Sequence, residues 1–295
     1  MGDILTDMKK SHDYLVCIDS DGCLFDNMEL KHKECFCPAT VNVWELQGVS
    51  KYAREAAEFV NLYSRTRGFN RFPALIRTLE LTYARPEVQA RGYHLPDLEP
   101  LKRWIQETPV LSAAEIERLA QSGTPLAPVV MQAARWSREV DENIKRIVRH
   151  VPPFPYAKDA MAKLGTFADV IIVSATPHEA LVRELTEHGI DKLVNVIAGQ
   201  ELGTKTECIR KAMQGRYDAQ HVLKIGDAPS DKAAADANGV MFRPIIPGKE
   251  TESWKDILDE SADRFRDGTY RGAYMDHLVE QFLAALLEDP PWIQS

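Results

Sequence analysis

The sequence predicts an α/β fold, a doubly wound parallel sheet interrupted by an all-helical insert. From Tyr156 onward, short apolar runs alternate with segments of helical periodicity, which is typical of βαβ units. The stretch from about Leu30 to His150 shows helical periodicity only. A short apolar run at Tyr14–Ile18 indicates a buried strand before that stretch. The sheet therefore begins before the insert and resumes after it.

The elements of the α/β part follow one another in order. We expect strands at Tyr14–Ile18, Asp169–Val173, Val194–Ala198, His221–Ile225 and Val240–Ile246. We expect helices at Tyr156–Leu164, Pro177–His188, Thr204–Met213 and Ser230–Asn238, and a last helix that carries Tyr274, Leu278, Phe282 and Leu286 on one face. Parallel strands need such crossovers.

The insert shows helical spacing of apolar residues in three places, within 52–63, 72–79 and 133–147. Ser112 and Glu115 have the spacing of a capping box and predict a further helix. The proline-rich segment 151–155 indicates a hinge or a stiff linker. With 295 residues the chain has the length of about two domains. We expect a core of residues 1–29 and 152–295, and an inserted domain of residues 30–151.

Composition narrows the classes of function. The chain is 44% hydrophobic and 27% charged, and its 36 basic and 44 acidic residues give a net charge of −8. Because proteins that bind nucleic acid usually carry a basic excess, we expect no nucleic-acid partner. No apolar run approaches the ~18 residues of a membrane span, and no leader pattern precedes the first strand. We expect a cytoplasmic protein without membrane contact, its five cysteines reduced.

Polar residues follow the predicted strands. Asp19, Ser20, Asp21 and Gly22 follow the first strand, and Ser174 to Thr176 follow the second. Lys205 lies beyond the third, and Gly226, Asp227 and Asp231 follow the fourth. Ligands of open parallel sheets bind beyond the carboxyl ends of the strands, so these groups predict a site. Alone, each could be a turn former or a helix cap, and Asp231 could be a favourable first-turn carboxylate.

The ordered set resembles the four motifs of the haloacid dehalogenase superfamily of hydrolases. Asp19 to Gly22 match the first motif, Ser174 the second, Lys205 the third, and Gly226-Asp227 through Asp231 the fourth. The resemblance covers roughly half of the chain. It implies a Rossmann-like catalytic core, and it implies that the insert is a type-1 helical cap. Cys23 stands where many members have Thr, and Lys205 lacks the Pro that follows it in some branches.

The resemblance also implies a mechanism. Asp19 would attack phosphorus as the nucleophile, and Asp21 would act as general acid and then as general base. Ser174 and Lys205 would contact the phosphoryl group. The branches that cleave C–Cl or C–P bonds lack an Asp at the position of Asp21, so its presence favours phosphoryl transfer.

Charge balance predicts a cation. Asp19, Asp21, Asp227 and Asp231 carry up to −4 and a phosphate monoester adds close to −2, whereas Lys205 returns +1. Mg²⁺ prefers oxygen ligands and also binds substrate phosphate. The expected ligands are Asp19, the Asp21 carbonyl and Asp227, with Asp231 bound through water or behind the ligands.

Other candidates are less specific. Arg65, Arg67 and Arg71 could bind a second anionic group of the substrate, although a solvated helix end is the favoured explanation for them. Thr176 is a further candidate for substrate contact. His32, Cys35 and Cys37 are close enough in sequence for a soft-metal site, but no fourth ligand accompanies them.

The expected function is Mg²⁺-dependent hydrolysis of a small phosphorylated metabolite. Two alternatives stay open. One is a phosphomutase that uses the same aspartyl-phosphate, and the other is a binding or regulatory protein that keeps the fold without turnover. Whether the protein is a monomer or a homodimer also stays open.

Overall fold

The computed structural model describes residues 3–123 and 125–293. The chain divides into two compact units. The first extends to Asn27 and resumes from His150 to Leu286, and the second runs from Met28 to Arg149 and takes in the chain from Leu287 onward. The roles of catalytic core and cap that we expect for them stay predictions.

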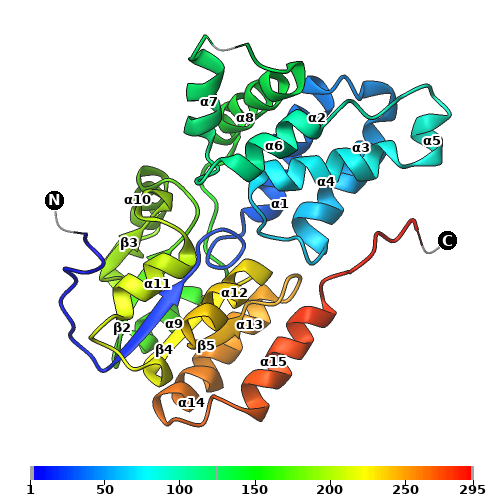
Figure 1. Cartoon of the computed structure of the whole chain (residues 1–295). Helices are drawn as coiled ribbons and strands as arrows, with labels where there is room; N and C mark the ends of the chain where they lie inside the picture. The colour runs from blue at the N-terminus through cyan, green and yellow to red at the C-terminus, as the bar shows by residue number, and fades with distance from the viewer. Residues whose placement is uncertain (1–2, 124, 294–295) are drawn as a thin grey trace. The chain divides into compact units, whose positions relative to one another are not determined.

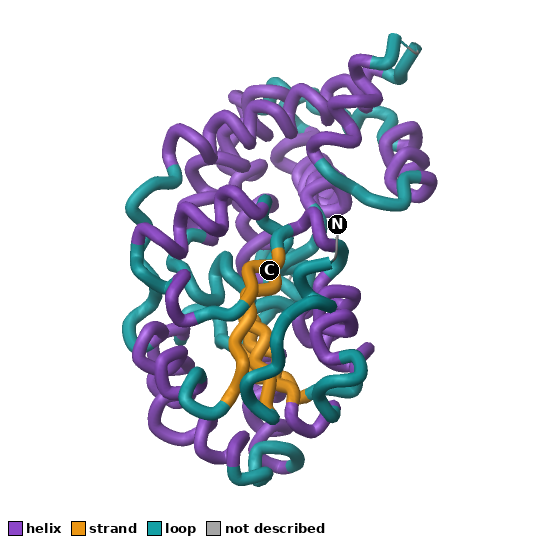
Figure 2. The backbone as a smooth tube through the Cα atoms, turned by 90° about the vertical axis from the view of Figure 1, so that its left-hand side faces the viewer, coloured by secondary structure: helices purple, strands orange, loops and turns teal. Residues whose placement is uncertain are grey.

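The first unit contains a five-stranded parallel sheet (Figures 1 and 2). Its strands are β1 (Tyr14–Ile18), β2 (Ala168–Val173), β3 (Val196–Ala198), β4 (Val222–Gly226) and β5 (Met241–Pro244). They lie in the order β3-β2-β1-β4-β5, so the direction of winding reverses between β1 and β4. Such a reversal opens a crevice at the carboxyl ends of the two strands.

Helices cover both faces of this sheet. They are α9 (Ala157–Leu164), α10 (His178–Glu187), α11 (Lys205–Met213), α12 (Pro229–Asn238), α13 (Glu250–Asp256), α14 (Ala262–Arg266) and α15 (Ala273–Ala284). Alternate residues of β1 point to opposite faces. Val16 and Ile18 pack in the cluster of α9, α10 and α13, whereas Leu15 and Cys17 pack in that of α11, α12 and α15. The predicted doubly wound α/β fold is confirmed.

The second unit is helical over its described residues. It contains α1 (Met28–Lys31), α2 (Cys37–Val43), α3 (Ser50–Glu58), α4 (Arg71–Tyr83), α5 (Pro86–Gln89), α6 (Glu99–Glu107), α7 (Ala113–Gln121) and α8 (Pro128–Ile147), with π-helical turns at His32–Phe36 and Phe59–Tyr63. Its core includes Trp136, whose Nε1 donates to Thr40 Oγ1 at 3.0 Å. Ser112 Oγ accepts the Glu115 N–H at 3.1 Å and caps α7 as predicted, whereas the Glu115 carboxylate bonds to Arg118 rather than completing a capping box.

From Leu287 to Ile293 the chain belongs to the helical unit. The Leu287 N–H donates to the Tyr63 carbonyl at 2.9 Å, and the Leu287 carbonyl accepts from Arg65 at 3.0 Å. The Trp292 ring lies 4.3 Å from the Arg85 guanidinium and 5.7 Å from the ring of Phe59. The expected core extended to residue 295, and a short tail without apolar periodicity carries no signal for where its half-buried tryptophan packs.

None of the described helices combines the length and the apolar character that crossing a membrane would require.

Candidate active site

The first site segment is the tight turn after β1. The Asp19 N–H donates to the Ile225 carbonyl at 3.0 Å, so the ladder between β1 and β4 continues to this residue. The Ser20 carbonyl then accepts the Leu24 N–H at 2.8 Å, and Gly22 adopts φ 69°, a left-handed conformation that favours glycine. The backbone therefore turns sharply and leaves the Asp19 carboxylate at the strand end, 5% exposed.

A buried tryptophan is hydrogen-bonded to the backbone of this turn. Trp254 of α13 is fully buried, and its Nε1 donates to the Cys23 carbonyl at 2.7 Å. Buried indole N–H groups normally find such an acceptor.

The second site segment joins β4 to α12. Asp231 lies in the first turn of α12, and its Oδ2 accepts the Ala228 N–H at 3.3 Å. Its side chain lies directly over Gly226, where an added Cβ would come within 2.3 Å of the Asp231 Cγ. Glycine at position 226 therefore makes room for this carboxylate.

Lys205 connects the two segments. It is the first residue of α11, a helix capped by Thr204 and Glu207 in a capping box. Its Nζ lies 2.6 Å from Asp19 Oδ2 and 2.7 Å from Asp231 Oδ1. Residues from three separate elements thus converge at the carboxyl ends of β1 and β4.

A second lysine belongs to this group, and our sequence analysis did not single it out. Lys224 of β4 is fully buried, and its Nζ lies 3.0 Å from Asp231 Oδ1. The signal for it was present in the sequence as one charged residue within the apolar strand His221–Ile225.

Burial and neighbouring charges shift the ionisation of the group. Loss of hydration, with the Asp231 charge adding to it, raises the pKa of Asp19 to about 7, against the opposing effect of Lys205 and Lys224. Burial also disfavours the charged form of Asp231, but the two lysines outweigh it and hold the pKa of Asp231 below its usual range. The pKa of Lys205 is raised, because the attraction of Asp19 and Asp231 exceeds the effect of its burial.

Asp21 is held by side chains from two directions. Thr176 Oγ1 donates to Asp21 Oδ2 at 3.0 Å, and Asn27 Nδ2 donates to Asp21 Oδ1 at 2.6 Å. Ser174 continues the ladder from β2, because its N–H donates to the Ala198 carbonyl at 3.0 Å, and its Oγ accepts the Thr176 N–H at 3.2 Å. Thr176, expected at the substrate, therefore contacts Asp21, and Asn27 is a further partner that the sequence pattern did not reveal.

The site offers ligands for a hard cation. Ligand oxygens of Asp19, Asp227 and Asp231 lie within 4.8 Å of one another, and all three residues are buried. Carboxylate oxygens are the donors that Mg²⁺ prefers, so the residues fit that ion. Among residues 3–123 and 125–293 this is the one group of three or more metal-ligating side chains that converges. His32, Cys35 and Cys37 form no such group there, and Cys35 and Cys37 are buried free thiols.

The three arginines of the insert have partners within the helical unit. Arg65 pairs with Glu288, and Arg71 lies 2.7 Å from Asp141 and 3.1 Å from the Ser137 hydroxyl. Arg67 is buried and donates to the Leu62 carbonyl at 3.0 Å. These contacts explain the arginines structurally, and their role toward a substrate stays a prediction.

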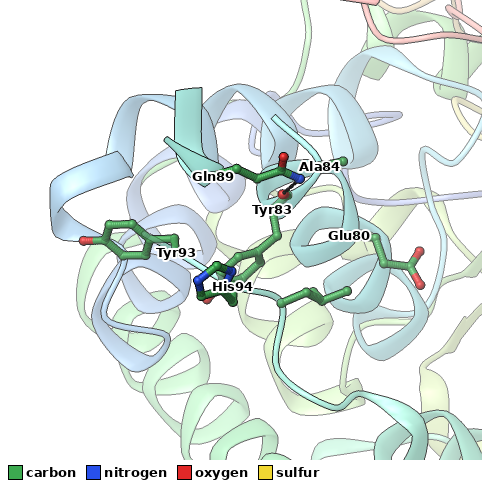
Figure 3. Close-up of a pocket in the computed structure, with 7 residues that line it drawn as sticks. Glu80, Tyr83, Ala84, Gln89, Tyr93 and His94 are labelled. Carbon is green, nitrogen blue, oxygen red and sulfur yellow. Dashed lines mark hydrogen bonds between the residues drawn. The ribbon is translucent and has the colours of Figure 1, made fainter. Parts of the chain in front are cut away.

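The helical unit also has a surface cavity of about 350 Å³ (Figure 3). The residues that line it are Glu80, Tyr83, Ala84, Gln89, Tyr93, His94 and Leu95. None of them was a predicted site residue, and they come from α4, the residue after it, α5 and the loop that follows α5.

Comparison with known proteins places the chain in a family. A family model described as haloacid dehalogenase-like hydrolase matches residues 97–244, which is half of the chain. In structure the chain is similar to a protein of Haemophilus somnus described as a predicted phosphoglycolate phosphatase, with 13% identity, a TM-score of 0.51 and coverage of 85% of this chain and 98% of that one. It is also similar to a haloacid dehalogenase-like family hydrolase of Streptococcus pneumoniae, with 14% identity, a TM-score of 0.43 and coverage of 84% and 91%. No curated protein matches the chain.

The matched range contains Ser174, Lys205, Asp227 and Asp231, and Asp19 and Asp21 precede it. The likeness to the Haemophilus somnus structure supports the fold. Since the family model spans half of the chain, we conclude that the chain belongs to the haloacid dehalogenase-like hydrolase family.

Proposed function

We propose that this protein is a Mg²⁺-dependent phosphatase that hydrolyses a small phosphorylated metabolite through an aspartyl-phosphate on Asp19. The supporting observation is the buried group in which Lys205 holds Asp19 at 2.6 Å, with Asp227 and Asp231 beside it. Such a group is costly to bury for structure alone, and strongly perturbed carboxylates in a cleft are typical of catalytic sites.

Asp19, the Asp21 carbonyl and Asp227 would hold the metal ion, with Asp231 bound through water or behind these ligands. When bound, Mg²⁺ supplies positive charge that offsets the carboxylates and the phosphate dianion and favours the ionised form of Asp19. The chain itself contributes two lysine charges against these three carboxylates.

In the first step Asp19 acts as the nucleophile. One carboxylate oxygen forms a bond to phosphorus while the bond between phosphorus and the ester oxygen breaks. The departing oxygen takes a proton from Asp21, the general acid. Lys205, and Ser174 as a hydrogen-bond donor, stabilise the charge that develops on the phosphoryl oxygens.

In the second step Asp21 acts as the general base. It takes a proton from a water molecule whose oxygen attacks phosphorus, and the bond between phosphorus and Asp19 breaks. Inorganic phosphate leaves, and both carboxyl groups return to their starting state. Thr176 and Asn27 support this role, because they fix the orientation of the Asp21 carboxylate.

The test measures phosphate release from an aryl phosphate and a panel of small phosphorylated metabolites, with Mg²⁺ and with EDTA. We expect Mg²⁺-dependent release, and we expect Asp19→Asn to lower it at least about 10³-fold without unfolding the protein. Asp13→Asn makes the same chemical change just before the amino end of β1, on an exposed side chain, and serves as the control. A folded Asp19→Asn protein with full activity would contradict the nucleophile assignment.

Isomerisation of a sugar phosphate without phosphate release would replace the phosphatase by a phosphomutase. Tight binding of a metabolite without any turnover would replace it by a binding protein.

A further inference from the structure

A fully buried lysine interrupts the apolar run of β4. Every residue of this strand is buried, and Lys224 is 0% exposed. Its neighbours in register, Cys17 of β1 and Phe242 of β5, belong to the apolar cluster formed with α11, α12 and α15. An ammonium group in such surroundings is strongly unfavourable unless its charge is compensated, and an apolar residue of similar volume is often the more stabilising choice. Stability alone therefore does not account for Lys224.

The compensating charge is Asp231, and that carboxylate is fixed from several sides. Its Oδ1 lies 3.0 Å from the Lys224 ammonium and 2.7 Å from that of Lys205. Its Oδ2 accepts the Ala228 N–H, and its Cγ lies over Gly226. Lys224 thus contacts the carboxylate that in turn holds Lys205 against Asp19.

Lys224 changes the net charge of the buried group at the site. Asp19, Asp227 and Asp231 carry −3 when ionised, and Lys205 and Lys224 contribute +2, so the group carries −1. Without Lys224 the group would carry −2, and Lys205 alone would have to offset the three carboxylates before it could attract a phosphoryl group. Unpaired charge at a buried site acts strongly because the dielectric constant is low.

We propose that Lys224 is a positioning residue that holds Asp231 and leaves the charge of Lys205 to the phosphate bound at Asp19. The inference rests on the proposed phosphatase function. It predicts effects of opposite sign on the two ions of the site, because removal of a positive charge weakens the binding of an anion and strengthens the binding of a cation.

The experiment uses the full chain with Lys224→Met, which removes the charge at nearly constant volume. Calorimetry gives the affinity for Mg²⁺ alone, and inhibition by inorganic phosphate at saturating Mg²⁺ gives the affinity for the anion. We expect phosphate to bind about tenfold more weakly and Mg²⁺ to bind more tightly by a similar factor. Lys232→Met removes a lysine from the next position after Asp231, where it pairs with Asp236 at 2.6 Å, and should change neither affinity.

Two results would overturn the proposal for Lys224. Unchanged affinities would show that its charge does not reach the site, and an equal loss of both would indicate a structural role only. If Lys224→Met does not fold, Lys224→Gln keeps a hydrogen-bond donor without the charge and must show the same opposite shifts.

Failure of the proposed function is seen separately, in the unmodified protein. A wild-type chain that binds neither Mg²⁺ nor phosphate would overturn the phosphatase assignment and this inference with it.

Discussion

The two ends of the same parallel sheet both contain buried carboxylates, and they are built differently. At the amino end, Asp169 of β2 is 0% exposed, and its Oδ2 accepts the Ser11 N–H at 2.9 Å, the His12 N–H at 3.0 Å and the Tyr217 hydroxyl at 2.7 Å. At the carboxyl end, Asp19, Asp227 and Asp231 crowd within 4.8 Å of one another.

The difference separates a structural carboxylate from a candidate catalytic group. Asp169 Oδ2 accepts from three neutral donors, and the His12 ring lies 3.5 Å from Oδ1. These contacts tie the segment before β1 to the sheet, and Arg216 also holds that segment through the Leu5, Thr6 and Met8 carbonyls. At the carboxyl end, the negative charges of Asp19, Asp227 and Asp231 repel one another, which is unfavourable unless a cation binds between them. Burial alone therefore does not distinguish a structural carboxylate from a catalytic one. The groups that contact the carboxylate make that distinction.

The largest expected effect comes from Asp227→Asn. We expect Mg²⁺-dependent phosphate release to fall at least about 10³-fold, because an amide is a poorer ligand for a hard cation than a carboxylate. The thermal midpoint of the metal-free protein should not fall. The measurements are phosphate release and thermal unfolding in EDTA. A fully active Asp227→Asn protein would contradict the assignment of a catalytic role to the carboxylates at the carboxyl end.

The matched change at the amino end is Asp169→Ala. It leaves two backbone N–H groups and the Tyr217 hydroxyl without their acceptor, so we expect the free energy of unfolding to fall by about 3 kcal/mol. Activity per folded molecule should stay at the wild-type level. Urea denaturation, with phosphate release assayed well below the thermal midpoint, tests both parts. A stable but inactive Asp169→Ala protein would mean that the amino end also serves function.

The next prediction concerns the stability of the metal-free protein as the pH changes. Asp19 has a pKa of about 7 in the folded protein against an ordinary value of 3.8. Between these values the folded chain binds a proton that the unfolded chain does not, so stability falls as the pH rises from about 4 to about 7. Asp19→Asn removes this titration, while Lys205 keeps its contact with Asp231.

We therefore expect the Asn variant to be more stable than the wild type at pH 8 in EDTA, by roughly 2 kcal/mol, and the gap to close toward pH 4. Urea titrations across this range provide the comparison. Parallel stability curves for the two proteins would show that crowding at the carboxyl end does not cost folding stability.

Much of this architecture could be predicted from the sequence because its signals are local. The strands show as short apolar runs, and chemistry in a parallel sheet gathers at the carboxyl ends, so Asp19, Asp21, Ser174, Lys205 and Asp227 could be named in advance. The structure brings Asp19 and Lys205 into direct contact and holds Asp21 through Thr176.

What could not be predicted depends on pairing across the fold. In the sequence, Lys224 appears only as a charged residue in an apolar run. Its partner, Asp231, is identified only from the packing of α12 against β4. Asp169 shows only as the polar start of a strand, with donors 157 and 48 residues away. The docking of Trp292 beside Arg85 likewise joins segments that share no periodicity.

The smallest expected effect is that of Tyr217→Phe. This change removes one of the three donors to Asp169 Oδ2 and leaves the two backbone N–H groups in place. One hydrogen bond to a charged acceptor contributes about 1.5 to 3 kcal/mol, and we expect a loss at the low end, about 1.5 kcal/mol, because Asp169 keeps its other partners. The burial of the hydroxyl and its bond to Asp169 also raise the pKa of Tyr217, so the wild-type phenol should stay protonated in ultraviolet titration to well above pH 10. Urea denaturation measures the loss. A decrease as large as that of Asp169→Ala would show that the Tyr217 hydroxyl alone stabilises the Asp169 carboxylate. The difference between the two ends of the sheet would then depend on one tyrosine and not on all three donors to Asp169 Oδ2.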